Sequence, residues 1–291
     1  MTIDWEGAEV SAEAFNSLDA LRETLGDAPM THFMSAAYFT RDLLAPAVVT
    51  GIADEVRPND ELAIHLHTWR SLVIAAGVTP KINPSFLSGR EPVEFDKLDD
   101  VGFETDPDAY TVPELRAMIR TTRKLIERLH HPIAATFRAG GYVGTTKMLA
   151  AVGSEGIHID SSAIDARHLA DVTDKFWLKR LAQLWPNIDP ASQPYMLDSA
   201  GGAMLEMPIS ATADYASVDQ IHGILEAAIA RLRATPNRDV FVVLSSHFET
   251  GQDYAARFGA ALKKLAGDRD ALMFTTLDGA AELARSALTK P

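Results

Sequence analysis

Residues 60–69 constrain the fold and the chemistry of this chain more than any other stretch. They read Asp-Glu-Leu-Ala-Ile-His-Leu-His-Thr-Trp, an apolar run that ends in two histidines separated by one residue. Such a run predicts a buried β-strand, and side chains two residues apart on a strand point to the same face. His65 and His67 therefore indicate a metal site about as strongly as they indicate one packed and one solvated histidine.

The segments before this strand alternate between strand and helix patterns. We expect strands over residues 1–4 and 30–35, and helices over residues 12–25 and 43–56. This alternation predicts parallel strands joined by crossover helices. Parallel strands of α/β proteins present functional side chains at their carboxyl ends, which is where the two histidines lie.

The rest of the chain continues the pattern with one long interruption. Residues 81–108, which contain two glycines and three prolines, are either a substrate-covering loop or a plain surface insertion. Residues 165–198 are irregular, with tryptophans that are either core plugs or a sugar-stacking surface. We expect further helices and strands as follows: helices from 111 to about 129 and over 145–152, 218–232, 255–265 and 277–288; strands over 132–137, 157–160, 204–209, 239–244 and 271–275.

Composition narrows the possible ligands. The chain has 40 acidic and 27 basic side chains, a formal net charge of -13, and no long basic run, which disfavours nucleic acid as a partner. It has no cysteine, so a metal would be held by nitrogen and oxygen ligands. No apolar segment approaches transmembrane length and no leader is recognisable at the start, so we expect a cytoplasmic protein without membrane insertion.

Four more polar residues stand near predicted strand ends. Asp4 and Glu6 share a face if the first strand continues for two residues, although acids near a chain start are commonly just solvated. Arg138 ends a strand ahead of two glycines, where a guanidinium could hold a carboxylate or form a salt-bridged turn. His247 follows a strongly apolar strand. It could act at the same rim as the histidine pair or pack against it.

Taken in order, these residues resemble the polysaccharide deacetylase family, the NodB-homology domain of carbohydrate esterases. The resemblance runs from residue 2 to about residue 249 and rests on five short motifs, each weak alone but found in the family's order. The motifs are Thr-Ile-Asp-Trp-Glu at 2–6, Glu-Leu-Ala-Ile-His at 61–65, Phe-Arg-Ala-Gly-Gly at 137–141 with Asp-Ser-Ser at 160–162, Leu-Glu-Met-Pro at 205–208, and Ser-His-Phe at 246–248.

The resemblance implies a role for each site residue. Asp4 corresponds to the general base, Arg138 to the arginine that braces it, and His247 to the general acid. Many relatives have two adjacent aspartates in the first motif, whereas here Trp5 intervenes and Glu6 takes the place of the metal-binding acid. The second motif usually has another histidine three or four residues on; positions 68–70 are Thr-Trp-Arg here, so His67 joins His65 as a metal ligand.

The family likeness also implies a fold and a reaction. The expected fold is α/β, a distorted (β/α) barrel with seven or eight mostly parallel strands, forming a single domain over residues 1–291. The expected activity is metal-dependent removal of an acetyl group from an N-acetylated sugar or glycan, by hydrolysis of an amide carbon–nitrogen bond, with Zn2+ as the metal. Two alternatives stay open: an amidohydrolase-type hydrolase, which also uses His-x-His, and a catalytically inactive glycan-binding relative.

Overall fold

A computed structural model of the chain describes residues 1–41, 46–89, 100–169 and 175–288. In these parts, nine strands form one sheet in the order β6-β7-β5-β4-β3-β2-β1-β9-β8. All neighbouring strands run parallel except β6 and β7. The strands are β1 Thr2–Trp5, β2 Thr31–Ser35, β3 Glu61–Leu66, β4 Ile133–Ala139, β5 Ile159–Asp160, β6 Tyr195–Ser199, β7 Gly202–Glu206, β8 Ile209–Thr212 and β9 Val243–His247.

The sheet curls, and a short chain segment between β7 and β8 joins its two ends. β7 pairs with β5 and β8 pairs with β9, yet only Met207 and Pro208 separate β7 from β8 in the sequence. An isolated bridge between Ile164 and Ile209 adds a contact across this junction. The predicted distorted (β/α) barrel is therefore confirmed. It has eight parallel strands, and the antiparallel β6 is added at one edge.

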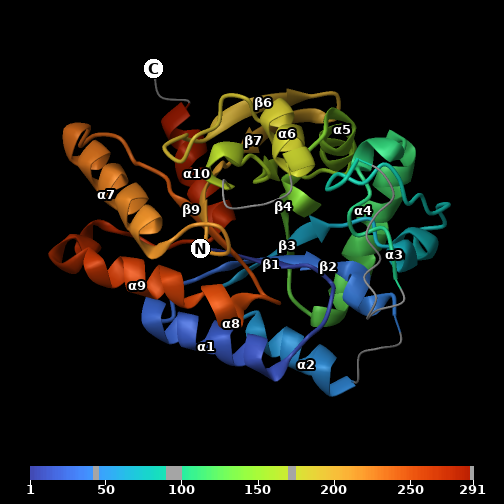
Figure 1. The fold of residues 1–291 in the computed structure, drawn as a ribbon, viewed down its shortest axis with the longest axis horizontal. Helices are drawn as coiled ribbons and strands as arrows, with labels where there is room; N and C mark the ends of the chain where they lie inside the picture. The colour runs from blue at the N-terminus through green and yellow to red at the C-terminus, as the bar shows by residue number, and fades with distance from the viewer. Residues whose placement is uncertain (42–45, 90–99, 170–174, 289–291) are drawn as a thin grey trace.

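Helices surround the curled sheet on its outside (Figure 1). Local signals set several of their ends. α1 begins after Ser11, whose side chain accepts a hydrogen bond from the Ala14 amide, and stops at Gly26, which has a φ of 69°. The described helices are α1 Ala12–Leu25, α2 Pro46–Glu55, α3 Arg70–Ala75, α4 Val112–Ile126, α5 Thr146–Ser154, α6 Lys175–Leu184, α7 Val218–Ala234, α8 Gly251–Tyr254, α9 Ala256–Lys264 and α10 Leu277–Leu288.

Several expected elements differ from those observed. No strand forms over residues 239–242 or 271–275, although both stretches are apolar and the former was expected to begin the strand that carries His247. At 239–242 the backbone amide and carbonyl of Phe241 are bonded by the side chain of Gln193 instead of a neighbouring strand. The expected strand over 204–209 is two strands, β7 and β8, because it bends at Pro208.

The segment expected to be irregular, residues 165–198, contains helix α6 and strand β6. In α6, Trp177 and Leu181 are buried one helical turn apart. β6 pairs with β7 as a hairpin whose turn includes Gly201, and Gly202, the first residue of β7, has a φ of 120° that favours glycine. Within the described parts of the chain, no helix is long and apolar enough to cross a membrane.

Candidate active site

Six polar side chains converge at the carboxyl rim of strands β1, β3, β4 and β9. Parallel neighbours place their carboxyl ends together, and here the register pairs Asp4 with His247 and His65 with Arg138. Glu6 follows directly after β1 and His67 follows just after β3, and both join the same group. The structure therefore brings together every residue for which the sequence suggested a role.

Glu6, His65 and His67 form a compact group of possible metal ligands. One ligand atom from each lies within 4.8 Å of the others. Nε2 of His65 lies 3.4 Å from Oε1 of Glu6, and Nε2 of His67 lies 2.5 Å from Oε2. Although β3 ends at Leu66, the extended backbone continues far enough for His67 to point to the same side as His65. The two imidazoles converge as the His-x-His spacing predicted.

Backbone carbonyls fix the orientation of both imidazoles. Nδ1 of His65 lies 3.0 Å from the carbonyl oxygen of Arg138, and Nδ1 of His67 lies 2.9 Å from that of Phe103. A carbonyl can only accept, so each Nδ1 carries the hydrogen and each Nε2 presents a lone pair toward Glu6. The ring of Phe103 also stacks on His67 at 4.0 Å.

This donor set fits a divalent metal ion. Glu6 Oε2 and His67 Nε2 are buried, and among the described residues neither has a hydrogen-bond partner. Two facing lone pairs at 2.5 Å repel one another unless a cation or a proton lies with them. Two imidazoles and one carboxylate are ligands that zinc accepts, with a further coordination position left open.

The electrostatics of Glu6 agree with this arrangement. Burial alone would raise the pKa of the Glu6 carboxyl group, but His67 and His65, when they are protonated, hold its pKa well below the usual range. A divalent cation in place of those protons would favour the ionised carboxylate in the same way.

Asp4 and Arg138 form a buried ion pair beside this group. Nη1 of Arg138 donates to Oδ1 of Asp4 at 2.6 Å, and neither side chain is exposed to solvent. The same nitrogen also donates to Thr2 and Ser245, and Ser245 in turn donates to Asp4. The contact expected between Arg138 and a carboxylate at this rim is present, and it fixes Asp4 in one orientation.

His247 lies between Glu6 and a carboxylate that the sequence had not indicated. Its Nε2 is 3.3 Å from Oε1 of Glu6, and its Nδ1 is 3.0 Å from Oδ2 of Asp214. Burial lowers the pKa of His247, but Asp214, Glu6 and Asp4 outweigh it and raise the pKa to about 10. Asp214 follows β8, so a strand predicted to continue beyond residue 209 would have placed it at the same rim.

Two buried tryptophans support the loop that follows Arg138. The indole of Trp177 donates to the carbonyl of Gly141 at 2.8 Å, and that of Trp185 donates to the carbonyl of Tyr142 at 2.9 Å. Tyr142 places its hydroxyl 3.4 Å from Nε2 of His247. With exposures of 4% and 6%, the tryptophans are core plugs and not a sugar-stacking surface.

The expected covering loop contacts the site in its described parts. Phe103 stacks on His67, and a bridge joins Ser85 to Thr105. Residues 90–99 of this loop lie outside the described residues. Whether the loop covers a substrate stays a prediction.

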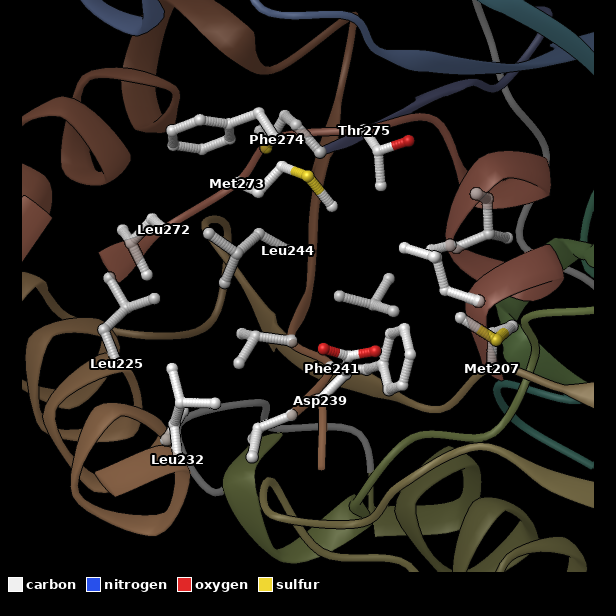
Figure 2. Close-up of a pocket in the computed structure, with 18 of the residues that line it drawn as sticks. Met207, Leu225, Leu232, Asp239, Phe241, Leu244, Leu272, Met273, Phe274 and Thr275 are labelled. Atoms are coloured by element: carbon white, nitrogen blue, oxygen red, sulfur yellow. The ribbon is translucent and has the colours of Figure 1, made fainter. Parts of the chain in front are cut away.

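A hollow of about 210 Å³ lies away from this site, beside the amino ends of the strands. It is next to the amino ends of β1 and β9, and Figure 2 shows apolar side chains such as Leu225, Leu244 and Phe274 around it. One carboxylate side chain, Asp239, is part of its lining. The hollow shares no residue with the group at the carboxyl rim. The possible metal ligands lie in that group, so the rim is the candidate active site.

Comparison with known proteins relates the fold to that of deacetylases. No protein-family profile and no curated protein sequence matches the chain. A candidate polysaccharide deacetylase from Mycobacterium smegmatis is similar in structure, with a TM-score of 0.55 and 14% identity over 96% of this chain and 79% of that one. At this identity the likeness shows a shared fold. The expected resemblance to polysaccharide deacetylases is confirmed at that level.

Two further solved structures are more distant. The Xyl-CE4 domain of a multidomain xylanase from the hindgut metagenome of Trinervitermes trinervoides has a TM-score of 0.47 and 12% identity, over 100% of this chain and 90% of that one. A family 4 carbohydrate esterase from Streptomyces lividans, in complex with acetate, has a TM-score of 0.43 and 13% identity, over 92% and 87%.

Proposed function

We propose that this protein is a metal-dependent hydrolase that removes the acetyl group from an N-acetylated sugar. The observation that carries the proposal is the convergence of a three-ligand group, Glu6, His65 and His67, with a braced carboxylate and a histidine at one rim. The fold shared with the Mycobacterium smegmatis protein supports the same reading.

Glu6, His65 and His67 would hold the metal, and zinc suits their nitrogen and oxygen atoms. A divalent ion bound there would polarise the acetyl carbonyl group and lower the pKa of a nearby water molecule. The backbone carbonyls on both Nδ1 atoms keep the two imidazoles aimed at this position.

Asp4 is the proposed general base. It would take a proton from the water that attacks the acetyl carbon, for which it must be ionised and fixed in direction. The buried guanidinium of Arg138 favours the ionised carboxylate and holds Oδ1 at 2.6 Å. Oδ2 accepts a longer bond from Ser245, at 3.3 Å, and is the oxygen proposed to take the proton.

His247 is the proposed general acid. Asp214 holds its Nδ1, so its Nε2 faces the site and can donate a proton to the sugar nitrogen as the carbon–nitrogen bond breaks. Water has by then supplied the new carbon–oxygen bond, and the products are acetate and a free amino sugar. Without that proton the amine would be a poor leaving group.

The charge of the chain bears on the substrate class. With a formal net charge of -13, the protein repels polyanions, so a neutral N-acetylated glycan or glycan precursor is the proposed partner. The amino sugar that the reaction produces is a cation, and it would not be repelled on leaving.

The test combines metal analysis with an acetate assay. Purified protein should contain about one zinc per chain after zinc loading, and should release acetate from an N-acetylglucosamine oligomer. A chelator should abolish the release, and added zinc should restore it. Zinc-loaded protein that binds the oligomer without releasing acetate would instead favour the glycan-binding alternative. Protein that takes up no zinc would refute the metal site.

A further inference from the structure

Two carboxyl groups outside the site, Asp160 and Glu206, are completely buried side by side. They lie on the adjacent strands β5 and β7, where the register pairs them directly, and both have 0% exposure. Asp160 also pairs with Phe137, the residue before Arg138. Since side chains alternate along a strand, the pair lies on the face of the sheet opposite to the Arg138 guanidinium.

Burial of the two carboxyl groups disfavours a charge on each. Asp160 Oδ2 and Glu206 Oε2 have no hydrogen-bond partner among the described residues. Burial raises the pKa of Asp160. Burial, and then the charge of Asp160, raise the pKa of Glu206 well above its usual range. Glu206 is therefore the acid of the pair that holds a proton more readily.

The remaining oxygen of each carboxyl group holds the turn that follows β5. The Ser162 hydroxyl donates to Oδ1 of Asp160 at 2.7 Å, and the Ala163 amide donates to Oε1 of Glu206 at 3.0 Å. Ser162 also accepts from the amide of Ala139, which ties the turn to β4. Asp160 thus holds the Ser162 side chain and Glu206 holds the Ala163 backbone, both directly after Ser161.

Ser161 makes the contacts that orient Arg138. Its carbonyl accepts from Nε and its hydroxyl oxygen accepts from Nη2 of Arg138, both at 2.8 Å. The Ser161 hydroxyl then donates to the carbonyl of Met207 at 2.8 Å. Two of the three guanidinium nitrogens are therefore held by Ser161, and the third reaches Asp4.

We propose that the Asp160–Glu206 pair positions Arg138, through the turn at Ser161, so that the guanidinium stays aimed at Asp4. The inference deepens the proposed function and rests on it for its catalytic meaning. Burial raises the pKa of both acids, and the charge of Arg138 opposes this effect. Arg138 is itself paired with Asp4. Tyr195 on β6 is another titratable group beside the pair.

Two substitutions of Glu206 separate positioning from simple space filling. In Glu206→Gln, the amide oxygen can still accept from Ala163 and the amide nitrogen can donate to Asp160, which reproduces the protonated acid. We expect kcat close to that of wild type. In Glu206→Leu the side chain has a similar volume but can neither accept from Ala163 nor donate to Asp160. We expect its kcat to fall by about 10²-fold, with KM and zinc content nearly unchanged, because the base is misplaced and the substrate site is not.

Crystal structures of both variants would show the position of Arg138 relative to Asp4 without any substrate. We expect the Arg138–Asp4 bond to persist in Glu206→Gln and to be lost or lengthened in Glu206→Leu. Tyr195→Phe, which alters a neighbour of the pair and leaves the turn intact, is the control and should match wild type. If wild type releases no acetate, the proposed function fails, but the structures still decide whether the pair positions Arg138.

Several outcomes would overturn the inference. An unchanged Arg138–Asp4 bond and unchanged kcat in Glu206→Leu would do so, as would a folded Glu206→Gln that loses as much activity as the leucine variant. If Glu206→Leu does not fold, Ser162→Ala takes its place, since it removes one hydroxyl group from the same chain of contacts. A shift of Arg138 in that variant supports positioning, and an Arg138 that stays in place refutes it.

Discussion

His247 tests proton transfer apart from metal binding. Its Nδ1 is held by Asp214, and although it also groups with Asp4 and Glu6, the proposed metal ligands are Glu6, His65 and His67. We expect His247→Ala to lower kcat by roughly 10²- to 10⁴-fold, the range for one positioned proton donor. The measurement is acetate release from an N-acetylglucosamine oligomer by both proteins at equal zinc occupancy. Equal rates would remove His247 from the mechanism.

His67 tests the metal site itself. Its Nε2 is buried and lacks a hydrogen-bond partner among the described residues, as expected for an atom that binds an ion. We expect His67→Ala to lose stoichiometric zinc in metal analysis after dialysis, because one of three ligands is removed. His158→Ala, a substitution of an exposed histidine, is the matched control and should keep its zinc. Retention of zinc by His67→Ala would contradict the proposed ligand set.

At the scale of elements, the junction between β4 and the following turn Gly140–Tyr142 leaves no room for a side chain. A Cβ atom at Gly140 would lie 2.5 Å from Cγ of His67, closer than real contacts allow. The His67 ring is fixed by its stacking on Phe103 and would have to move. We expect Gly140→Ala to weaken zinc binding by about 10- to 100-fold, as changes to the surroundings of metal ligands do.

Zinc titration against a competing chelator measures this effect. Gly223→Ala on α7 is the control, because a Cβ atom there meets nothing within 4 Å. It should leave zinc binding unchanged and stabilise the helix by about 0.5–1 kcal/mol. Equal zinc affinities in the two variants would show that His67 tolerates the displacement.

At the scale of the whole molecule, Asp60 joins several elements near the amino end of β3. It accepts from Arg22 of α1 at 2.6 Å and from the Met30 amide at 2.9 Å, and it contacts the buried His32 of β2. Burial opposes ionisation of Asp60, but His32 and Arg22 together hold the pKa of its carboxyl group below the usual range. Asp60→Asn removes the buried carboxylate that lies 2.6 Å from Arg22 and should cost about 3 kcal/mol of unfolding free energy at pH 7.

The pH dependence of that cost has a definite sign. A carboxyl group whose pKa is lower in the folded state stabilises the protein above its unfolded pKa of about 3.9, and loses this effect as the pH falls toward the folded pKa. Urea unfolding from pH 7 to pH 3 should therefore show the wild type approaching Asp60→Asn. Asp54→Asn, at an exposed residue of α2, is the control. A difference that stays constant over this range would contradict the assignment.

The sequence by itself determined what depends on local geometry. The alternation of a pleated strand places His65 and His67 on one face, and the Ser11 cap and Gly26 set the ends of α1, because these effects act over a few residues. The rim position of Arg138 and His247 followed from the direction of parallel strands.

Only the tertiary structure decided which distant groups meet. Asp214 contacts His247 across 33 residues, and the Phe103 carbonyl orients His67 from 36 residues away. The sequence of residues 239–242 predicts a strand, but none forms there. A strand needs a neighbouring strand to complete its backbone hydrogen bonds. Here the Gln193 side chain bonds the Phe241 backbone instead. Pairings of this kind depend on where the folded chain places each partner, and no short stretch of sequence contains that information.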